Sequence, residues 1–312
     1  MDPFDFSGNC WFLVGPTASG KSAVGLALAR LLGAEIVSLD SMAVYRGMDI
    51  GTAKPSKSEL AAVPHHLIDV AEPTEDFSVS RYGELASKAV DEIRCRGREV
   101  LFVGGTPLYL TALLRGIDPG PAADWSLRDR LAAEAESAGP ERLHQRLAQV
   151  DPEAAARIHP HDARRIVRAL EVFERTGEPI SDRQQHFQAG RPAESCRVFV
   201  LDWPRDQLHA RINARCERMF VDGLVDEVRE LTRRHGMLGT TAGQAVGYRE
   251  ALRHLQGDYS LEKAIERTQA RSRQFARRQL IWYRRLSECR MVPLEGDLQA
   301  ERVAERIVSA AD

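Results

Sequence analysis

The sequence lacks several features that would place a protein in a class at once. None of its five cysteines lies at C-x-x-C spacing and their number is odd, so we expect reduced thiols and no structural zinc site. No run of about 18 apolar residues occurs, which argues against a membrane-spanning helix. Residues 1–8 are acidic and carry no basic start followed by an apolar stretch. We therefore expect no signal peptide and a cytoplasmic protein.

Strong net charge is also absent, because the formal charge of the 312 residues is only −2. Taken alone, that balance does not point to a nucleic-acid partner. The charge is unevenly distributed, however, since residues 197–290 hold 19 basic and 12 acidic side chains. The apolar content of 43% suffices for one sizeable core, and the length favours one large domain plus an insert.

Apolar runs and helical patterns alternate over the first 116 residues. Short apolar runs predict buried strands, and the segments between them have apolar residues at helical spacing. Such alternation is typical of an α/β protein with a parallel sheet and helices on both faces. The predicted strands are 10–14, 35–39 and 100–103, and the predicted helices are 21–32, 78–96 and 106–115.

The pattern changes after residue 116. Residues 118–123, rich in proline, glycine and alanine, predict a linker, and 126–177 show only helical patterns. A strand is predicted at 197–201, and the remainder is predicted to be helical, including one long helix at 262–287. We therefore predict an α/β core formed by residues 1–117 and 196–312, interrupted by a helical insert at 118–195.

One glycine-rich segment fits the phosphate-loop pattern G-x-x-x-x-G-K-[S/T], between a predicted strand and a predicted helix. Its glycines let several N–H groups converge on an anion, and the helix start adds a positive dipole. Lys21 supplies a cation, and the Ser22 hydroxyl can bind a phosphate-bound Mg²⁺. The motif predicts a diphosphate-bearing ligand and does not distinguish it from ATP or GTP. The residues predicted to hold it are Gly15, Pro16, Thr17, Ala18, Ser19, Gly20, Lys21 and Ser22.

Two further polar residues follow predicted strands. Asp40 comes after 35–39, and Thr106 comes after 100–103 and two glycines. Ligands of open parallel sheets bind beyond the carboxyl ends of strands, so both residues should approach the phosphate loop. Each also has a structural interpretation, because Asp40 can cap a turn and Thr106, followed by Pro107, can cap a helix.

Sequence blocks along nearly the whole chain match one known family in the expected order. The most specific block is YRGMDIGTAKP at residues 45–55. Together the blocks resemble the tRNA dimethylallyltransferase (isopentenyltransferase) family. The other matching segments are 15–22, 38–41, 64–69, 103–106, 108–109, 164–172, 243–248 and 277–279.

The resemblance implies a P-loop NTPase-like core that transfers a dimethylallyl group from dimethylallyl diphosphate. The acceptor is the exocyclic amine of the adenosine 3′-adjacent to a tRNA anticodon, and diphosphate is released. By this resemblance Asp40 accepts the proton of the amine. Lys21, Thr106 and Arg215 hold the diphosphate and stabilise it as it leaves, with Mg²⁺ as cofactor.

The resemblance also implies that the anticodon stem-loop of tRNA is the partner, held partly by the helical insert. A stacked base hides its amine, so the target must be reached in a single-stranded loop. We expect a monomer with no membrane partner. The implied tRNA-binding residues are Asp40, Ser41, Met42, Ala43, Arg128, Arg164, Arg165, Ile166, Val167, Arg168, Gln244, Gly247 and Tyr248.

Several alternatives stay open at this point. The same loop suits a P-loop nucleotide or small-metabolite kinase, a relative that prenylates free adenine nucleotides, or a non-catalytic RNA-binding module. The basic face of helix 262–287 suits either RNA phosphates or solvent. His65 and His66 lack further metal ligands at close spacing, so we interpret them as structural or as lining the cleft.

Overall fold

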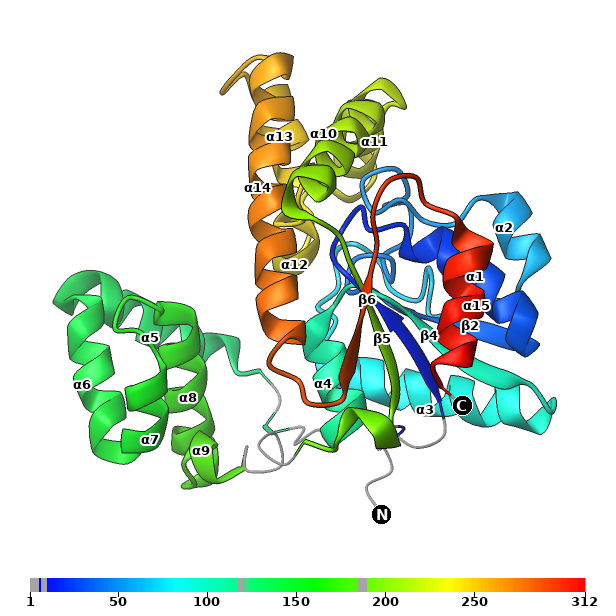
Figure 1. Cartoon of the computed structure of the whole chain (residues 1–312). Helices are drawn as coiled ribbons and strands as arrows, with labels where there is room; N and C mark the ends of the chain where they lie inside the picture. The colour runs from blue at the N-terminus through cyan, green and yellow to red at the C-terminus, as the bar shows by residue number, and fades with distance from the viewer. Residues whose placement is uncertain (1–5, 7–9, 117–119, 122, 184–189, 312) are drawn as a thin grey trace. The chain divides into compact units, whose positions relative to one another are not determined.

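The computed structural model describes residues 6, 10–116, 120–121, 123–183 and 190–311 (Figure 1). The chain divides into two compact units, each with its own core. We call residues 1–114 with 190–312 the sheet unit, and residues 115–189 the helical unit. Half of the linker predicted at 118–123, residues 118, 119 and 122, lies outside the described residues.

Six strands of the sheet unit form one parallel sheet in the order β3-β2-β4-β1-β5-β6. The predicted α/β class with a parallel sheet is thereby confirmed. Because all strands run the same way, their carboxyl ends meet at one edge, where ligands of such sheets bind. The strands are β1 (Trp11–Val14), β2 (Ala34–Leu39), β3 (His65–His66), β4 (Glu99–Gly104), β5 (Arg197–Asp202) and β6 (Cys289–Pro293).

Helices cover both faces of this sheet, as Figure 1 shows. The predicted helices near the N-terminus are confirmed within one residue at each end, and Gly33 closes α1 in the left-handed conformation. The helices of the sheet unit are α1 (Lys21–Leu32), α2 (Lys57–Ala62), α3 (Val79–Cys95), α4 (Pro107–Arg115), α10 (Arg205–Val221), α11 (Leu224–His235), α12 (Thr240–Gly243), α13 (Tyr248–Leu255), α14 (Leu261–Tyr283) and α15 (Ala300–Ser309), with the short 3₁₀ helix η2 (Ala193–Ser195).

Strand β1 separates two apolar clusters. Trp11 and Leu13 pack in one cluster with residues of α1 and α15, whereas Phe12 and Val14 pack in the other with residues of α3 and α4. Successive side chains of a strand point to opposite faces, so a strand buried on both faces consists of apolar residues throughout. This explains why the strand reads as a continuous apolar run and ends directly at the phosphate loop.

One prediction for the C-terminal part is wrong. Residues 289–293 were expected to be helical, but they form β6, which pairs in parallel with β5. The segment is short and contains Arg290, so its sequence alone carries little strand signal, and pairing with β5 decides its conformation. Helix α14 also ends at Tyr283, four residues before the predicted end at 287.

The helical unit contains only helices among its described residues, as predicted. Its apolar cluster includes Leu131, Leu143, Leu147, Ile166 and Leu170, all almost completely buried. Two of its helices begin with a proline, Pro140 and Pro152, whose missing N–H costs no hydrogen bond in the first turn. The helices are α5 (Trp125–Ala138), α6 (Pro140–Val150), α7 (Pro152–Arg157), α8 (Ala163–Thr176) and α9 (Ile180–Arg183).

No helix among the described residues is both long enough and apolar enough to cross a membrane.

Candidate active site

The phosphate loop connects β1 to α1 at the carboxyl edge of the sheet. Gly20 precedes the helix with φ = 88°, a left-handed conformation that glycine adopts without strain. Two side chains from the β5–α10 region hold the outer side of the loop. Trp203 donates its indole N–H to the Ser19 carbonyl at 2.8 Å, and Arg211 donates to the Ala18 carbonyl at 3.0 Å. The loop is therefore braced through its carbonyls.

A third brace comes from α14 and was not recognised as a site residue from the sequence. The buried Gln279 side chain accepts a hydrogen bond from the Thr17 N–H at 3.0 Å and donates one to the Gly105 carbonyl. Its only sequence signal was membership of a matching segment, 277–279. Gln279 thus touches both the phosphate loop and the turn that follows β4.

Asp40 and Thr106 meet through Ser41. The Ser41 N–H donates to the Thr106 hydroxyl at 3.0 Å, and that hydroxyl donates to the Ser41 hydroxyl at 3.3 Å. Thr106 also directly precedes α4, and its carbonyl accepts from the Leu110 N–H at 3.2 Å, as expected for the residue at the start of that helix. A Cβ on Gly104 would collide with the Leu39 backbone, so only glycine lets β4 approach β2 this closely.

Asp40 forms the turn predicted as its structural role. Its Oδ1 accepts from the Met42 N–H at 2.8 Å and from the Ala43 N–H at 3.4 Å. Among the described residues, its second oxygen, Oδ2, has no hydrogen-bond partner. Met42 and Ala43 point partly or fully into the protein, because Ala43 is buried and Met42 packs against the core. The free oxygen leaves Asp40 available for chemistry.

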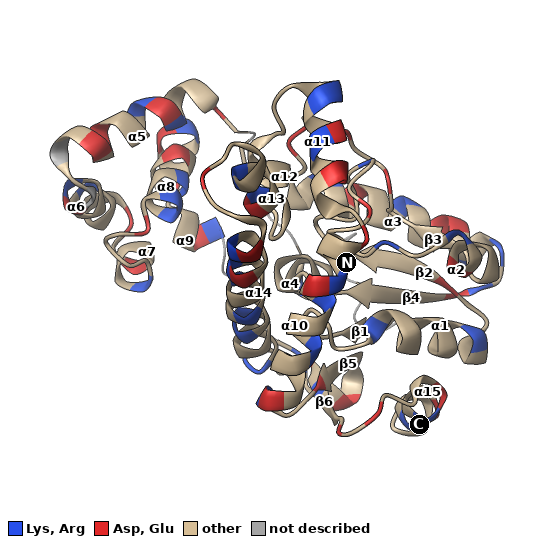
Figure 2. Ribbon diagram, turned by 90° about the horizontal axis from the view of Figure 1, so that it is seen from above, with Lys and Arg blue, Asp and Glu red and all other residues tan. Residues whose placement is uncertain are grey.

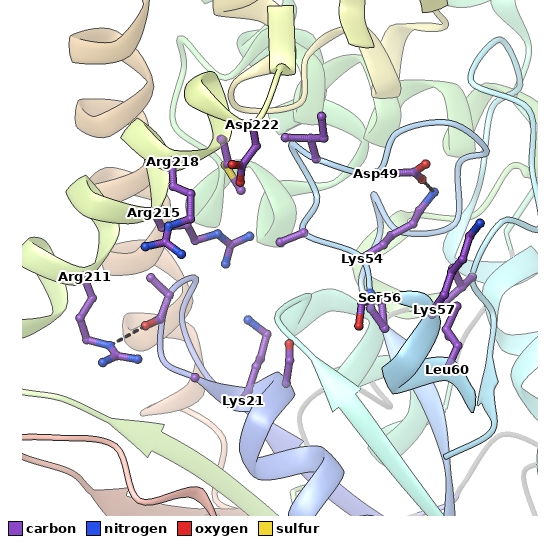
Figure 3. A pocket seen from close by; sticks show the side chains of 18 of the residues that line it. Lys21, Asp49, Lys54, Ser56, Lys57, Leu60, Arg211, Arg215, Arg218 and Asp222 are labelled. Atoms are coloured by element: carbon purple, nitrogen blue, oxygen red, sulfur yellow. Dashed lines mark hydrogen bonds and ion pairs between the residues drawn. The ribbon is translucent and has the colours of Figure 1, made fainter. Parts of the chain in front are cut away.

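An open pocket of about 940 Å³ lies over the phosphate loop (Figure 3). Lys21 and Ser22 of the loop form part of its lining, and one face of α10 contributes Arg211, Arg215 and Arg218. The segment from Asp49 to Leu60 lines the other side, as the labelled side chains show. Six basic and three acidic residues line the pocket, so an anionic ligand is favoured.

The charge of Asp40 raises the pKa of two basic groups of the pocket, Lys21 and Arg215. Burial and, to a smaller extent, the charge of Arg215 together lower the pKa of Lys21 to about 8, against the opposing effect of the Asp40 carboxylate. Burial also lowers the pKa of Arg215, again opposed by Asp40. The structure therefore brings the predicted Lys21, Arg215 and Asp40 into mutual electrostatic contact. An anion placed between the two cations would relieve their repulsion.

The pocket wall at residues 45–55 is held by two side chains that were not singled out from the sequence, the partly buried Glu227 and the buried side chain of Lys54. Glu227 accepts hydrogen bonds from the Asp49 and Ile50 N–H groups at 3.0 and 2.8 Å. Lys54, with a side chain only 6% exposed, donates to the Tyr45 carbonyl and to the carboxylates of Asp49 and Asp69.

The three predicted tRNA-binding residues at 244, 247 and 248 differ from one another in their exposure to solvent. Tyr248 is buried and donates its hydroxyl to Glu227 at 2.5 Å, and Gly247 is buried with φ = 93°. Gln244 is exposed. Tyr248 therefore supports the pocket wall, and within this trio only Gln244 presents its side chain to solvent.

The predicted tRNA-binding residues of the helical unit also separate into two kinds. Arg128 makes two hydrogen bonds of 3.0 Å to the fully buried Glu171, and Arg168 donates to the same carboxylate at 2.5 Å. Ile166 and Val167 belong to the apolar core. Arg164 and Arg165 are exposed on α8. Of these six residues only Arg164 and Arg165 are exposed, and Arg165 forms an ion pair with Asp162 at 3.5 Å.

Helix α14 carries the basic bands seen in Figure 2. Several of its cations are paired, including Arg271 with Glu250 at 2.5 Å and Arg273 with Asn213 at 2.6 Å. Arg277 and Arg278 are exposed. Glu250 thus neutralises Arg271, whereas the exposed Arg277 and Arg278 stand next to Gln279, which contacts the phosphate loop.

The two adjacent histidines take the structural role among the interpretations left open. His66 bonds to Glu35 at 2.7 Å, and His65 bonds to the Val63 carbonyl at 2.7 Å. Within the described ranges, no group of three or more His, Cys, Asp or Glu side chains could hold a metal ion.

The fold and site together define a P-loop-like α/β protein with an anion pocket beside a carboxylate. A model of the IPP transferase family matches residues 43–286. The tRNA dimethylallyltransferase of Geobacter metallireducens is 46% identical over 282 residues, covering 90% of this chain and 91% of that protein. That of Anaeromyxobacter dehalogenans is also 46% identical, covering 94% and 98%.

Solved structures agree with these sequence matches. The tRNA isopentenylpyrophosphate transferase of Bacillus halodurans aligns with a TM-score of 0.70 and 38% identity, covering 97% of this chain and 96% of that one. A eukaryotic dimethylallyltransferase acting on tRNA aligns with a TM-score of 0.74 and 25% identity, covering 92% and 74%. This chain belongs to the IPP transferase family, which confirms the resemblance and the predicted prenyltransferase class.

Proposed function

We propose that the chain transfers a dimethylallyl group from dimethylallyl diphosphate to the exocyclic amine of the adenosine 3′-adjacent to a tRNA anticodon. The observation that carries this proposal is the placement of Asp40 beside Lys21 and Arg215 at one edge of the sheet. A proton acceptor next to a diphosphate site suits transfer of the carbon group that the diphosphate carries. The names of the relatives give the same transferred group, dimethylallyl, and tRNA as the molecule acted on.

In the proposed reaction the adenosine amine attacks the allylic carbon attached to oxygen. The new C–N bond forms as the C–O bond breaks, and the electron pair of that bond leaves with the diphosphate. The proton of the amine passes to Oδ2 of Asp40, while Oδ1 stays fixed by the turn. A positioned base of this kind contributes about 10²–10⁴ in rate.

The leaving diphosphate gains negative charge as the bond breaks. A positive surface for that charge is formed by Lys21, Arg215 and the N–H groups at the start of α1. Because the charge develops as the bond breaks, these groups stabilise the transition state more than the bound substrate. Thr106 adds a hydroxyl near the same edge. No phosphoryl group is transferred, so the loop acts only in binding and charge stabilisation.

Mg²⁺ fits this site as a cofactor bound mainly through the substrate. The exposed Ser22 hydroxyl lines the pocket and is an oxygen ligand of the type Mg²⁺ accepts, with phosphate oxygens and water completing its shell. When bound, the ion would neutralise part of the diphosphate charge. Ser22 is the residue we assign to it.

For tRNA we assign the exposed Arg164 and Arg165 to phosphates of the anticodon stem, since such contacts supply affinity without reading sequence. Arg128 and Arg168 can contact the tRNA only through the N–H groups that they do not already donate to Glu171. Residues 40–43 include the proposed proton acceptor Asp40, and we assign this segment to contact with the target nucleotide. We further infer a monomer that works in the cytoplasm, where its tRNA substrate is found.

The test supplies the purified protein with Mg²⁺, radiolabelled dimethylallyl diphosphate and unmodified tRNA that reads codons beginning with U. We expect label in acid-precipitable RNA, and none when the adenosine beside the anticodon is replaced by guanosine. Transfer should be lost in Asp40→Ala and Lys21→Ala. Steady ATP turnover with no label in RNA would overturn the proposal and favour a P-loop kinase.

A further inference from the structure

Gln279 joins two segments that are far apart in the chain. The Thr17 N–H belongs to the phosphate loop, 262 positions away, and the Gly105 carbonyl belongs to the turn after β4. The side chain is only 2% exposed, so water does not compete for either bond. One amide therefore sets the spacing between the loop and the turn.

The two backbone partners of Gln279 determine which kind of side chain can join them. A backbone N–H can only donate and a carbonyl can only accept, so the residue between them must offer one acceptor and one donor. Glutamine does so with a single planar group, and the two partners fix which end carries oxygen. A Cβ on Gly105 would lie 2.8 Å from Nε2 of Gln279, so the turn has no room for a larger residue.

Both segments lead directly to proposed reacting groups. The loop side continues to Lys21, and the turn side continues to Thr106, which holds Ser41 next to Asp40. We propose that Gln279 is a positioning residue that fixes the diphosphate-binding loop relative to the Asp40–Thr106 side of the site. This role rests on the proposed prenyl transfer for its meaning in catalysis, but its effect on anion binding can be measured alone.

Two variants test the proposal in the full-length protein. Gln279→Met keeps the length of the side chain and removes both hydrogen bonds. Gln279→Glu keeps the acceptor for Thr17 but places a carboxylate oxygen against the Gly105 carbonyl at neutral pH. The matched control is Gln269→Met, since Gln269 also lies on α14 and bridges to α10, through Asn213 and Glu217, away from the loop.

The first measurement is binding of inorganic pyrophosphate with Mg²⁺ by calorimetry. We expect both Gln279 variants to weaken binding about tenfold, the usual effect of leaving buried partners unsatisfied, and the control to bind like the wild type. In label transfer to tRNA, kcat should fall further than the pyrophosphate affinity. The displaced loop would also misalign the donor against Asp40.

A pH series supplies a readout that simple loss of packing would not change. A buried glutamate beside a carbonyl has a raised pKa, and its protonated form can donate to Gly105 as the amide does. Gln279→Glu should therefore approach wild-type pyrophosphate affinity as the pH falls, while Gln279→Met should not. Values are taken relative to wild type at each pH, because Lys21, Arg215 and Asp40 surround the site.

The outcomes separate the two proposals. If Gln279→Glu and Gln279→Met bind pyrophosphate and transfer label as well as Gln269→Met, the positioning role is wrong. If the wild type binds pyrophosphate but labels no tRNA, prenyl transfer is wrong, and the pyrophosphate comparison still decides whether Gln279 positions the loop.

Discussion

Strand β2 carries a carboxylate near each end, and the two have different surroundings. Glu35 has a side chain 8% exposed, and it accepts two hydrogen bonds from Arg96 at 2.9 and 2.8 Å and one contact from His66. The Arg96 hydrogen bonds and, to a smaller extent, His66 together lower its pKa to about 2, against the opposing effect of burial. Asp40 has one oxygen tied to its own turn and faces the cations of the loop.

The comparison shows how a structural carboxylate differs from a candidate base. At Glu35 both oxygens are used, so the group stabilises the fold only as long as it stays ionised. At Asp40 one oxygen holds the geometry and the other is available to a proton. The unused lone pairs, together with nearby cations that need an anion, mark the reactive end of the strand.

The largest effect on activity is expected for Asp40→Asn, which tests whether this carboxylate acts as the base. The asparagine oxygen can still accept from the Met42 N–H, so the turn and the fold should persist. The amide cannot accept the amine proton, so the rate of label transfer should fall by about 10²–10⁴. Single-turnover transfer to tRNA measures the rate, with circular dichroism and pyrophosphate binding as controls for folding and for the loop. Transfer at the wild-type rate would remove Asp40 from the mechanism.

Glu35→Gln should produce the opposite result, a loss of stability with unchanged chemistry. Removing the charge beside Arg96 and His66 should lower the free energy of unfolding by about 2–3 kcal/mol at pH 7. The folded pKa lies below the unfolded value, so this stability is present above pH 4.5 and lost as the pH falls toward 2. Urea denaturation at pH 7 and pH 3 measures the difference, which should shrink at pH 3. Reduced kcat in the folded variant would contradict the structural role.

A smaller effect is expected from the titration of Lys21, one of the cations near Asp40. With a pKa of about 8 in the free protein, its charge is present below pH 8 and lost above it. Binding of a diphosphate favours the charged form, so the KM for dimethylallyl diphosphate should rise by up to roughly tenfold per pH unit above 8. Lys21→Arg, which stays charged, is the control and should show a flatter profile. Parallel profiles for the two proteins would show that another group titrates.

Local pattern predicted much of this site, and long-range contacts account for the rest. The phosphate loop and Asp40 could be found because each follows a short apolar run, and parallel pairing then brings strand ends together. Tyr248 could not be interpreted from its neighbours, because its partner Glu227 lies 21 residues earlier in the chain. Strand β6 was missed because it depends on pairing with β5. Gln279 depends on contacts 174 and 262 positions away.

The helical unit shows the same distinction between charged side chains that are held by a buried partner and side chains that are exposed. Testing it gives the smallest expected effect. Arg128 and Arg168 are committed to Glu171, whereas Arg164 and Arg165 are exposed. The double variant Arg164→Ala with Arg165→Ala should raise the KM for tRNA about three- to tenfold at low salt. It should also reduce the slope of log KM against log salt by about one per lost phosphate contact.

A matched pair on the same unit separates specific contact from loss of charge. Arg130 and Arg157 are exposed and pair with Glu174 and Glu153. Replacing both with alanine removes the same formal charge, and we expect almost no change in the KM for tRNA or in its salt slope. The KM for dimethylallyl diphosphate should stay constant in both double variants, since neither alters the loop. Equal effects of the two pairs on tRNA would mean that general charge, and not the end of α8, attracts the RNA.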